Sequence, residues 1–212
     1  MSPSSSIGRD VLLGVGLIGV SALVWGTLIE RNAFTLRNVE AQVLEPGSAP
    51  LRVLHISDLH LAPWQKGKME WIRSLAELSP DLIVNTGDNL GHVAAIGPAL
   101  TALKPLLERT GVFVNGSNDY YAPVARNPLA YLKKPSERSE GQPLETARLV
   151  GGFTSAGWLD LNNRQGRAVI NGVSINFVGL DDAHDGLDDL SKIPTAGELS
   201  SGADLVIGVS HA

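Results

Sequence analysis

From residue 51 onward the chain alternates short apolar runs with longer amphipathic segments. Strand-length apolar runs occupy 51–56, 82–84, 112–114 and 204–210. Helical spacing of apolar residues fills 66–78 and 94–108 between them. Residues 167–179 predict a hairpin with Asn171-Gly172 as its two-residue turn. Strands that alternate with helices predict an α/β architecture with helices covering the sheets, and both helical bundles and all-β sandwiches fit poorly.

Polar clusters follow four of the predicted strands: Asp58-Leu-His60, Gly87-Asp88-Asn89, Gly116-Ser-Asn-Asp119 and Ser210-His211. In open α/β sheets, ligands bind at the carboxyl ends of the strands. Asp58 and His60 can reach the same ion, and Asp88 from the next strand can bridge two ions. Each cluster alone is more often a turn, with an Asp capping backbone amides. The four together favour a metal centre, and their oxygen and imidazole ligands suit Mn, Fe, Zn or Mg.

Composition excludes several other kinds of site. The chain has no cysteine, which removes disulfides, thiolate metal sites, iron–sulfur clusters and cysteine nucleophiles. Its net charge of -5 argues against a nucleic-acid-binding surface, which would normally be basic.

The segment from Val11 to Ile29 is apolar and carries no charge. As a helix it would be about 28 Å long, close to the thickness of the bilayer hydrocarbon core. We expect residues 1–31 to form an uncleaved membrane anchor with one transmembrane helix, and residues 32–50 to form a linker. A cleaved signal peptide and a buried core helix are the alternatives. The side of the membrane is undecided, because Arg9 and the N-terminal amine on one side are balanced by Arg31 and Arg37 on the other.

The motifs His55-Ile-Ser-Asp58-Leu-His60-Leu, Asn85-Thr-Gly87-Asp88-Asn89, Gly116-Ser-Asn-Asp119 and Ser210-His211 together resemble the calcineurin-like metallophosphoesterases. The chain is most similar to their membrane-attached bacterial branch, which implies the bacterial plasma membrane. The resemblance covers residues 51–212 and implies an α/β/β/α sandwich of two mixed sheets. It also implies two divalent metal ions, with Asp58 and His60 on the first, Asp88 bridging both and His211 on the second. The implied reaction is hydrolysis of phosphomonoesters or phosphodiesters by a metal-activated hydroxide.

The third motif departs from the family pattern of Gly-Asn-His followed by Asp or Glu. Ser117 stands where the family has its Asn ligand, and Asn118 stands where it has the catalytic His. We expect Ser117 or Asn118 to complete the metal ligands, with His92 and Asn118 as the catalytic candidates. The alternative for His92 is an exposed residue at a helix N-terminus. The substrate-binding candidates are Asn89, Asp119 and Tyr120, and core packing is equally compatible with Tyr120.

The family's last motif, Gly-His-x-His, would follow Ser210-His211, but the chain stops at Ala212. We therefore expect an incomplete metallophosphoesterase domain with impaired activity. One alternative function is a non-catalytic, membrane-tethered module that keeps the fold, and another is an enzyme acting on lipid-linked pyrophosphates. We also expect His55 to be a packed or hydrogen-bonded core residue. The acidic segment 181–189 is interpreted as a solvated loop, with added outer-shell ligands as the alternative.

Overall fold

The structure, a computed structural model, describes residues 4–124 and 141–211. Contacts divide the chain into two compact units, residues 1–40 and 41–212. Between the last N-terminal helical turn and the first strand, residues 33–52 form no regular helix or strand.

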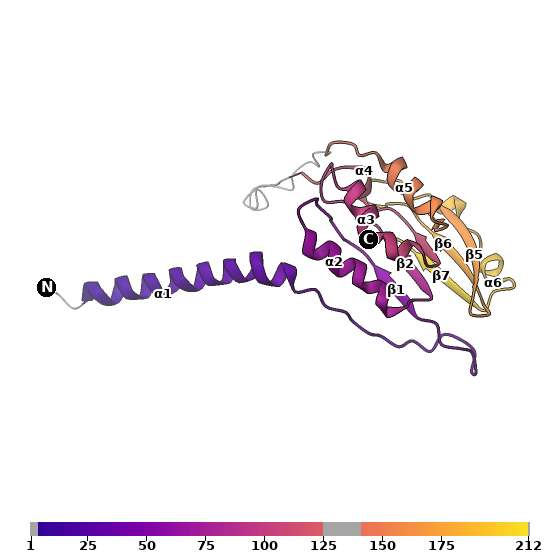
Figure 1. The fold of residues 1–212 in the computed structure, drawn as a ribbon, viewed down its shortest axis with the longest axis horizontal. Coiled ribbons are helices and arrows are strands. Elements are labelled where there is room, and N and C mark those ends of the chain that lie inside the picture. Colours follow the sequence, from indigo (N-terminus) through magenta and orange to yellow (C-terminus); the bar gives the residue numbers. More distant parts are fainter. Residues whose placement is uncertain (1–3, 125–140, 212) are drawn as a thin grey trace. The chain divides into compact units, whose positions relative to one another are not determined.

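The N-terminal unit is built on helix α1, Ser4–Val24 (Figure 1). It continues as a π-helical segment, Trp25–Ile29, and a 3-10 turn, Glu30–Asn32. Large apolar side chains of this unit are exposed, Leu17 by 68% and Ile18 by 72%. Within the part of the chain that the structure describes, no helix has both the length and the apolar character needed to cross a membrane. The transmembrane helix over residues 11–29 therefore stays a prediction.

The first sheet of the C-terminal unit has four parallel strands in the order β1-β2-β3-β4. These are β1 Val53–Ile56, β2 Leu82–Asn85, β3 Gly111–Phe113 and β4 Leu159–Asp160. Their crossovers contain helices α2 Lys66–Ser74, α3 Ile96–Leu107 and α5 Thr146–Ser155. The prediction that both sheets are mixed is wrong for this one, because each strand returns through a helical crossover and so runs parallel to its neighbour.

The second sheet is mixed. Strands β5 Arg164–Ile170 and β6 Val173–Gly179 pair antiparallel, and β7 Leu205–Val209 pairs parallel to β6. The predicted hairpin is confirmed, with Asn171 and Gly172 at φ values of 51° and 84°. A two-residue turn with both φ values positive matches the twist of the flanking strands.

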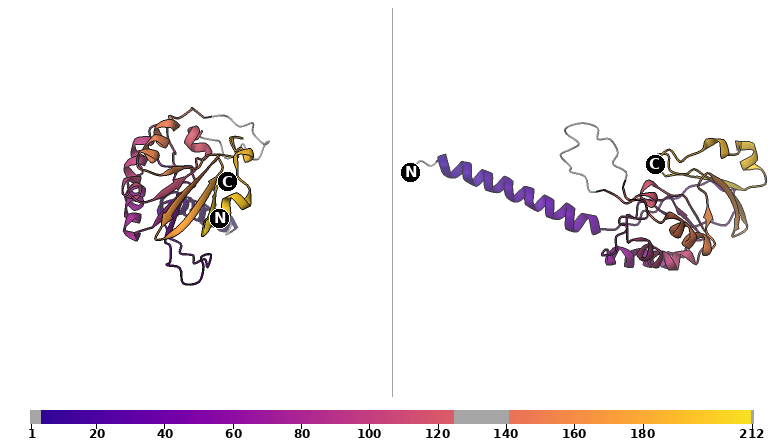
Figure 2. Two further views of the ribbon diagram at one scale, coloured as in Figure 1. Left: turned by 90° about the vertical axis from the view of Figure 1, so that its right-hand side faces the viewer. Right: turned by 90° about the horizontal axis from the view of Figure 1, so that it is seen from above.

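Burial alternates along β2 and divides the core into two layers. Ile83 packs with the helical layer, in a cluster that includes Ile72, Leu103 and Phe153. Leu82 and Val84 pack toward the second sheet, in a cluster that includes Ile175, Phe177 and Val209. The order is therefore helices, parallel sheet and mixed sheet, as Figure 2 shows.

One further short helix, α6 Ala196–Ser200, lies on the outer face of the second sheet. The Asn176 amide of β6 donates to the Leu199 carbonyl at 2.6 Å, which ties this helix to the sheet. Among the described residues, the connection from β6 to β7 contains only this helix and a 3-10 turn, Leu190–Lys192, so it forms no long helix as a fourth layer.

The prediction that His55 is a core residue is wrong, although its side chain is hydrogen-bonded. His55 lies on β1 and is exposed, and its Nε2 is 2.9 Å from the Thr86 hydroxyl. It faces the same side of the sheet as Val53, which is 43% exposed, so this face of β1 is not part of the core.

Candidate metal centre

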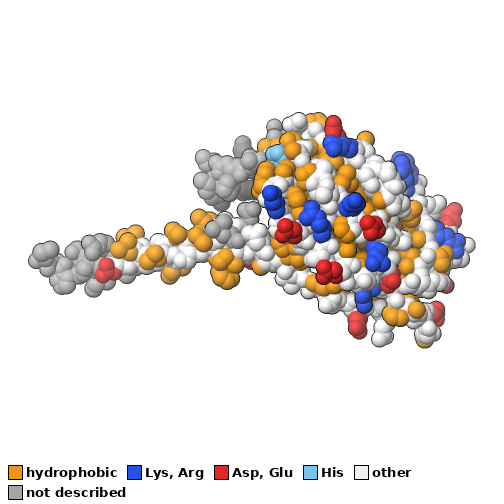
Figure 3. All heavy atoms as spheres, in the orientation of Figure 1, with side chains coloured by type: hydrophobic (Ala, Val, Ile, Leu, Met, Phe, Trp, Pro, Cys, Tyr) orange, Lys and Arg blue, Asp and Glu red, His pale blue; other side chains and the backbone are white. Residues whose placement is uncertain are grey.

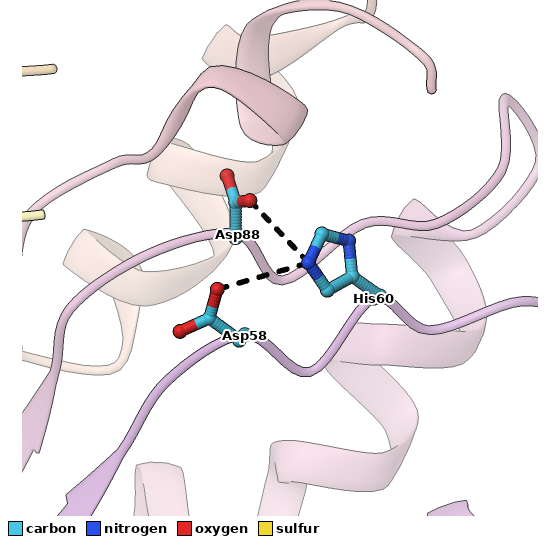
Figure 4. A group of neighbouring side chains, drawn as sticks. All are labelled: Asp58, His60 and Asp88. Carbon is cyan, nitrogen blue, oxygen red and sulfur yellow. Dashed lines mark ion pairs between the residues drawn. The ribbon is translucent and has the colours of Figure 1, made fainter. Parts of the chain in front are cut away.

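Asp58, His60 and Asp88 converge where the first two strands end (Figure 4). Asp58 and His60 lie in the loop after β1, and Asp88 lies in the loop after β2. His60 Nε2 is 3.4 Å from an Asp88 oxygen and 3.7 Å from an Asp58 oxygen. One ligand atom from each residue lies within 4.8 Å of the others. Among the described residues, this is the only such group of three or more His and acidic side chains.

The backbone in this group is strained. Asp58, His60 and Asp88 have φ values of 53°, 38° and 54°, in the left-handed region that non-glycine residues rarely adopt. Each such residue costs about 1–3 kcal/mol, and such strain clusters at functional sites. Hydrogen bonds hold the two loops together, from the Asp58 amide to the Gly87 carbonyl at 3.0 Å and from the His60 amide to the Asp88 carbonyl at 2.9 Å.

Glycines allow the loops after β2 and β3 to meet. A Cβ on Gly87, whose φ is 91°, would lie 2.3 Å from the Gly116 amide nitrogen. A Cβ on Gly116 would lie 2.3 Å from an Asp88 oxygen. This approach places Asn118 against Asp88, where the Asn118 backbone amide donates to one carboxylate oxygen at 2.8 Å. The Asn118 side-chain amide donates to the other oxygen at 2.6 Å.

His211 also reaches this centre. Its Nδ1 is 2.8 Å from the Thr86 carbonyl, and its Nε2 is 3.7 Å from an Asp88 oxygen. A backbone carbonyl can only accept, so Nδ1 carries the proton and Nε2 of the neutral ring is left as the lone-pair atom. Histidine ligands are oriented in this way by a hydrogen bond at the second ring nitrogen.

Asn89 and Asp119, both predicted to bind substrate, have no exposed surface. The Asp119 carboxylate accepts hydrogen bonds from the Asn89 backbone at 2.8 Å, the Asn89 side chain at 3.1 Å and the Gly116 backbone at 3.2 Å. Burial raises the pKa of Asp119 to about 7, against the lowering effect of these hydrogen bonds. Both side chains therefore connect the loop after β2 to the loop after β3, and neither has exposed surface that a substrate could contact.

The remaining candidates are spread around the centre. Ser117 is half-buried and begins the short helix α4, Ser117–Tyr120. Tyr120 donates its hydroxyl to Asp181 at 2.6 Å and accepts from the Asn115 side chain at 3.0 Å. Burial, followed by the hydrogen bond to Asp181, raises the pKa of Tyr120. His92 is half-buried, with its ring against Trp64 and its Nδ1 accepting from the Ala94 amide at 3.1 Å.

The acidic segment 181–189 is only partly the solvated loop that was predicted. Asp182 is fully buried, and its carboxylate accepts from the backbone amides of His184 and Asp185 at 3.2 and 3.1 Å. Burial raises the pKa of Asp182. Asp181 and Asp182 thus hold the loop after β6, and Asp181 connects that loop to α4 through Tyr120.

Two residues that position the centre were not among the predicted site residues. Buried Asn85 accepts from the Gly87 amide at 2.9 Å and donates to the Asn89 side chain at 2.8 Å. Its signal was the Asn-x-Gly spacing, since an Asn side chain often accepts from the backbone two residues on. Ser57 donates to the second oxygen of Asp58 at 2.5 Å.

Comparisons with known proteins identify the family. The family model for calcineurin-like phosphoesterases matches residues 51–212. The chain belongs to this family. It is 33% identical over 104 residues to a Bos taurus protein called "Transmembrane protein with metallophosphoesterase domain". That match covers 47% of this chain and 23% of the relative, so the chain spans about a quarter of the relative's length.

A solved structure also matches, that of Phosphopantetheinyl Hydrolase (PptH) from Mycobacterium tuberculosis. It is 19% identical to this phosphoesterase-family chain, with coverage of 60% of this chain and 41% of the other. The TM-score is 0.38, and the likeness carries no argument about this protein.

The candidate centre fits the divalent cations that the family binds. Its donors are two carboxylates and an imidazole, a set that suits Mn, Fe, Zn or Mg. They come from neighbouring loops, and both Asp88 oxygens face toward further polar groups, on His60 at one side and His211 at the other.

Proposed function

We propose that this family member hydrolyses phosphomonoesters or phosphodiesters in a metal-dependent reaction. The observation that carries the proposal is the convergence of Asp58, His60 and Asp88 at the ends of β1 and β2, with ligand atoms within 4.8 Å of one another. The strained backbone of all three residues supports it, since strain of this kind persists where function requires it.

In this proposal two divalent metal ions are held at the strand ends. Asp58, His60 and Asp88 would hold the first ion, and Asp88 and His211 would hold the second. We propose Ser117 and Asn118 as the further ligands of the second site. When bound, the two ions lower the pKa of a water molecule and neutralise charge on the phosphate oxygens.

The chain's own residues orient this centre. Asn118 fixes the plane of the Asp88 carboxylate through its two hydrogen bonds, of 2.8 and 2.6 Å. The Thr86 carbonyl holds the His211 ring with Nε2 toward Asp88. The Asn118 side-chain amide, which donates to Asp88, is the candidate donor to phosphate oxygens. We retain His92 as a candidate proton donor.

The proposal is tested by hydrolysis of a soluble chromogenic phosphodiester and of its monoester counterpart, with Mn²⁺ added to EDTA-treated protein. The wild-type protein should turn over at least one of them, and Asp88→Ala should abolish turnover while leaving the circular dichroism spectrum unchanged. Ser200→Ala is a matched control, because its hydroxyl donates within α6. Full activity in Asp88→Ala would refute the assignment.

A second candidate function is a non-catalytic module with the same fold. The observation in its favour is that Asn118 donates to both oxygens of Asp88, so it competes with cations for that carboxylate. This candidate predicts no turnover of either substrate by the wild-type protein, with at most one metal ion bound through Asp58, His60 and Asp88.

We also propose that residues 11–29 attach the protein to a membrane. The segment carries no charge, and its side chains at Leu17, Ile18 and Leu23 are 66–72% exposed. Exposed apolar surface of this extent is typical of a membrane-contacting segment. The test is flotation of the full chain with lipid vesicles, in which Leu17→Asp with Val20→Asp should move the protein to the unbound fraction. Unchanged flotation of that variant would contradict the attachment.

A further inference from the structure

A rim of apolar and basic side chains borders the metal centre. Trp64 is 64% exposed and Val93 is 43% exposed. Trp64 packs edge-on against His92, with ring centroids 5.0 Å apart and planes at 72°. Lys66 is also exposed and lies two residues after Trp64. We call Trp64, Lys66, His92 and Val93 the rim.

Backbone contacts fix the rim beside the centre. The Leu61 amide donates to the Asn89 carbonyl at 2.9 Å, and the Gly91 amide donates back to the Leu61 carbonyl at 2.7 Å. A Cβ on Gly91 would lie 2.4 Å from the His60 carbonyl oxygen, so the two loops touch directly after His60 and Asp88. Trp64 lies four residues after His60, and His92 lies four residues after Asp88. A surface that contacts the rim would therefore lie close to the metal centre.

Charge distinguishes the rim from the other surfaces around the centre. Residues 59–69 and 89–107 contain no Asp or Glu, although the chain has 22 acidic residues. The Lys68 ammonium donates to the Leu59 carbonyl, which adds a second positive charge at the base of the rim. By contrast, segment 181–189 contains five Asp residues. The outer face of the helices mixes acidic and basic side chains (Figure 3).

We propose that the rim rests on an anionic lipid bilayer, so that the centre receives phosphoesters carried by lipid headgroups. An exposed Trp next to Lys and an aliphatic side chain is suited to the interface, where the ring lies at headgroup level and the ammonium meets lipid phosphates. Within segments 59–69 and 89–107 the rim itself presents no carboxylate to an anionic surface. The exposed carboxylate directly before the first of these segments, Asp58, is one of the candidate metal ligands. The choice of substrate class rests on the proposed function, whereas the docking itself does not.

The chain has no cysteine, so a single introduced cysteine can carry an environment-sensitive fluorophore. Val93→Cys places the label on the rim, and Val169→Cys is the matched control, since Val169 is 67% exposed on β5. The full chain of each variant is labelled and mixed with vesicles of phosphatidylcholine and phosphatidylglycerol. The label at residue 93 should shift to shorter emission wavelength and be quenched by spin-labelled lipid, and the label at residue 169 should do neither. No shift at residue 93, or equal shifts at both positions, would overturn the docking.

A second measurement separates this inference from the proposed function. Trp64→Ser should lower Mn²⁺-dependent hydrolysis of a vesicle-borne headgroup phosphodiester several-fold more than hydrolysis of a soluble phosphodiester. Equal losses on the two substrates would overturn the substrate class. If no variant hydrolyses the soluble substrate, the proposed function has failed, and the fluorophore still decides whether the rim docks.

Discussion

Replacement of Gly116 by alanine should displace the candidate bridging carboxylate. The new Cβ would lie 2.3 Å from an Asp88 oxygen, 2.8 Å from the Asp88 amide nitrogen and 2.9 Å from the His211 ring. Asn118 pins the Asp88 side chain, so the carboxylate cannot simply rotate away. Gly116 has an extended backbone with φ of -112°, so the effect comes from the contact and not from backbone strain.

Overpacking of this kind costs about 1–3 kcal/mol of unfolding free energy. Relief of the contact requires movement of roughly 1 Å, and such a displacement of a reacting centre can cost about 10²-fold in rate. We therefore expect Gly116→Ala to bind Mn²⁺ more weakly in calorimetric titration and to lose most phosphodiesterase activity. Urea unfolding of the metal-free protein measures the stability change.

Gly151→Ala is the matched control. A Cβ on Gly151, within helix α5, meets nothing within 4 Å. It should stabilise the protein by about 0.5–1 kcal/mol through helix propensity and leave Mn²⁺ binding unchanged. Wild-type Mn²⁺ affinity and stability in Gly116→Ala would refute the claim that this glycine is needed for the close approach.

Three further predictions concern Asp119, Asn118 and Phe177. Because the pKa of Asp119 is about 7 in the fold against about 3.9 unfolded, its stabilising contribution is complete below pH 4 and is lost as the pH rises through 7. This change amounts to about 4 kcal/mol at most, and urea unfolding of metal-free wild type at pH 5 and pH 8 should show a dependence that Asp119→Asn flattens. Asn118→Ala should raise Mn²⁺ affinity measured by calorimetry, because it frees both Asp88 oxygens; unchanged or lower affinity would show that these hydrogen bonds do not compete with the ion. Phe177→Ala should lower the unfolding free energy by about 3–5 kcal/mol, because its side chain is fully buried between the sheets, and a loss below 1 kcal/mol in urea unfolding would contradict that packing.

Local signals were sufficient to predict the regular elements near the site. Leu82 to Val84 is an unbroken apolar run because the strand is buried on both faces, which is the pattern of a parallel strand. Asn171-Gly172 predicts its turn because both residues tolerate positive φ. Helix α5 was not predicted, and Gly151 and Gly152 in its interior have low helix propensity. Gly152 is explained by tertiary packing, since a Cβ there would lie 2.5 Å from the Leu100 side chain.

The candidate site was also predicted only in part, because some of its residues are placed by tertiary contacts. Asp58, His60 and Asp88 were found because strand ends gather polar residues at one edge of a parallel sheet. Asp119 belongs to the same motif but is buried, and residue type alone cannot distinguish a carboxylate that faces substrate from one that accepts three loop hydrogen bonds. The contact of Tyr120 with Asp181 joins residues 61 positions apart, which no local pattern indicates.

Anomalous diffraction from crystals grown with Mn²⁺ shows whether Asp58, His60 and Asp88 hold a metal ion. We expect a Mn²⁺ peak about 2.0–2.2 Å from His60 Nε2 and from one oxygen each of Asp58 and Asp88, at ordinary ligand distances. A second peak between Asp88 and His211 would support the bridging role of Asp88. No peak at Asp58, His60 and Asp88, with Mn²⁺ bound at segment 181–189 or nowhere, would refute a metal centre at these residues.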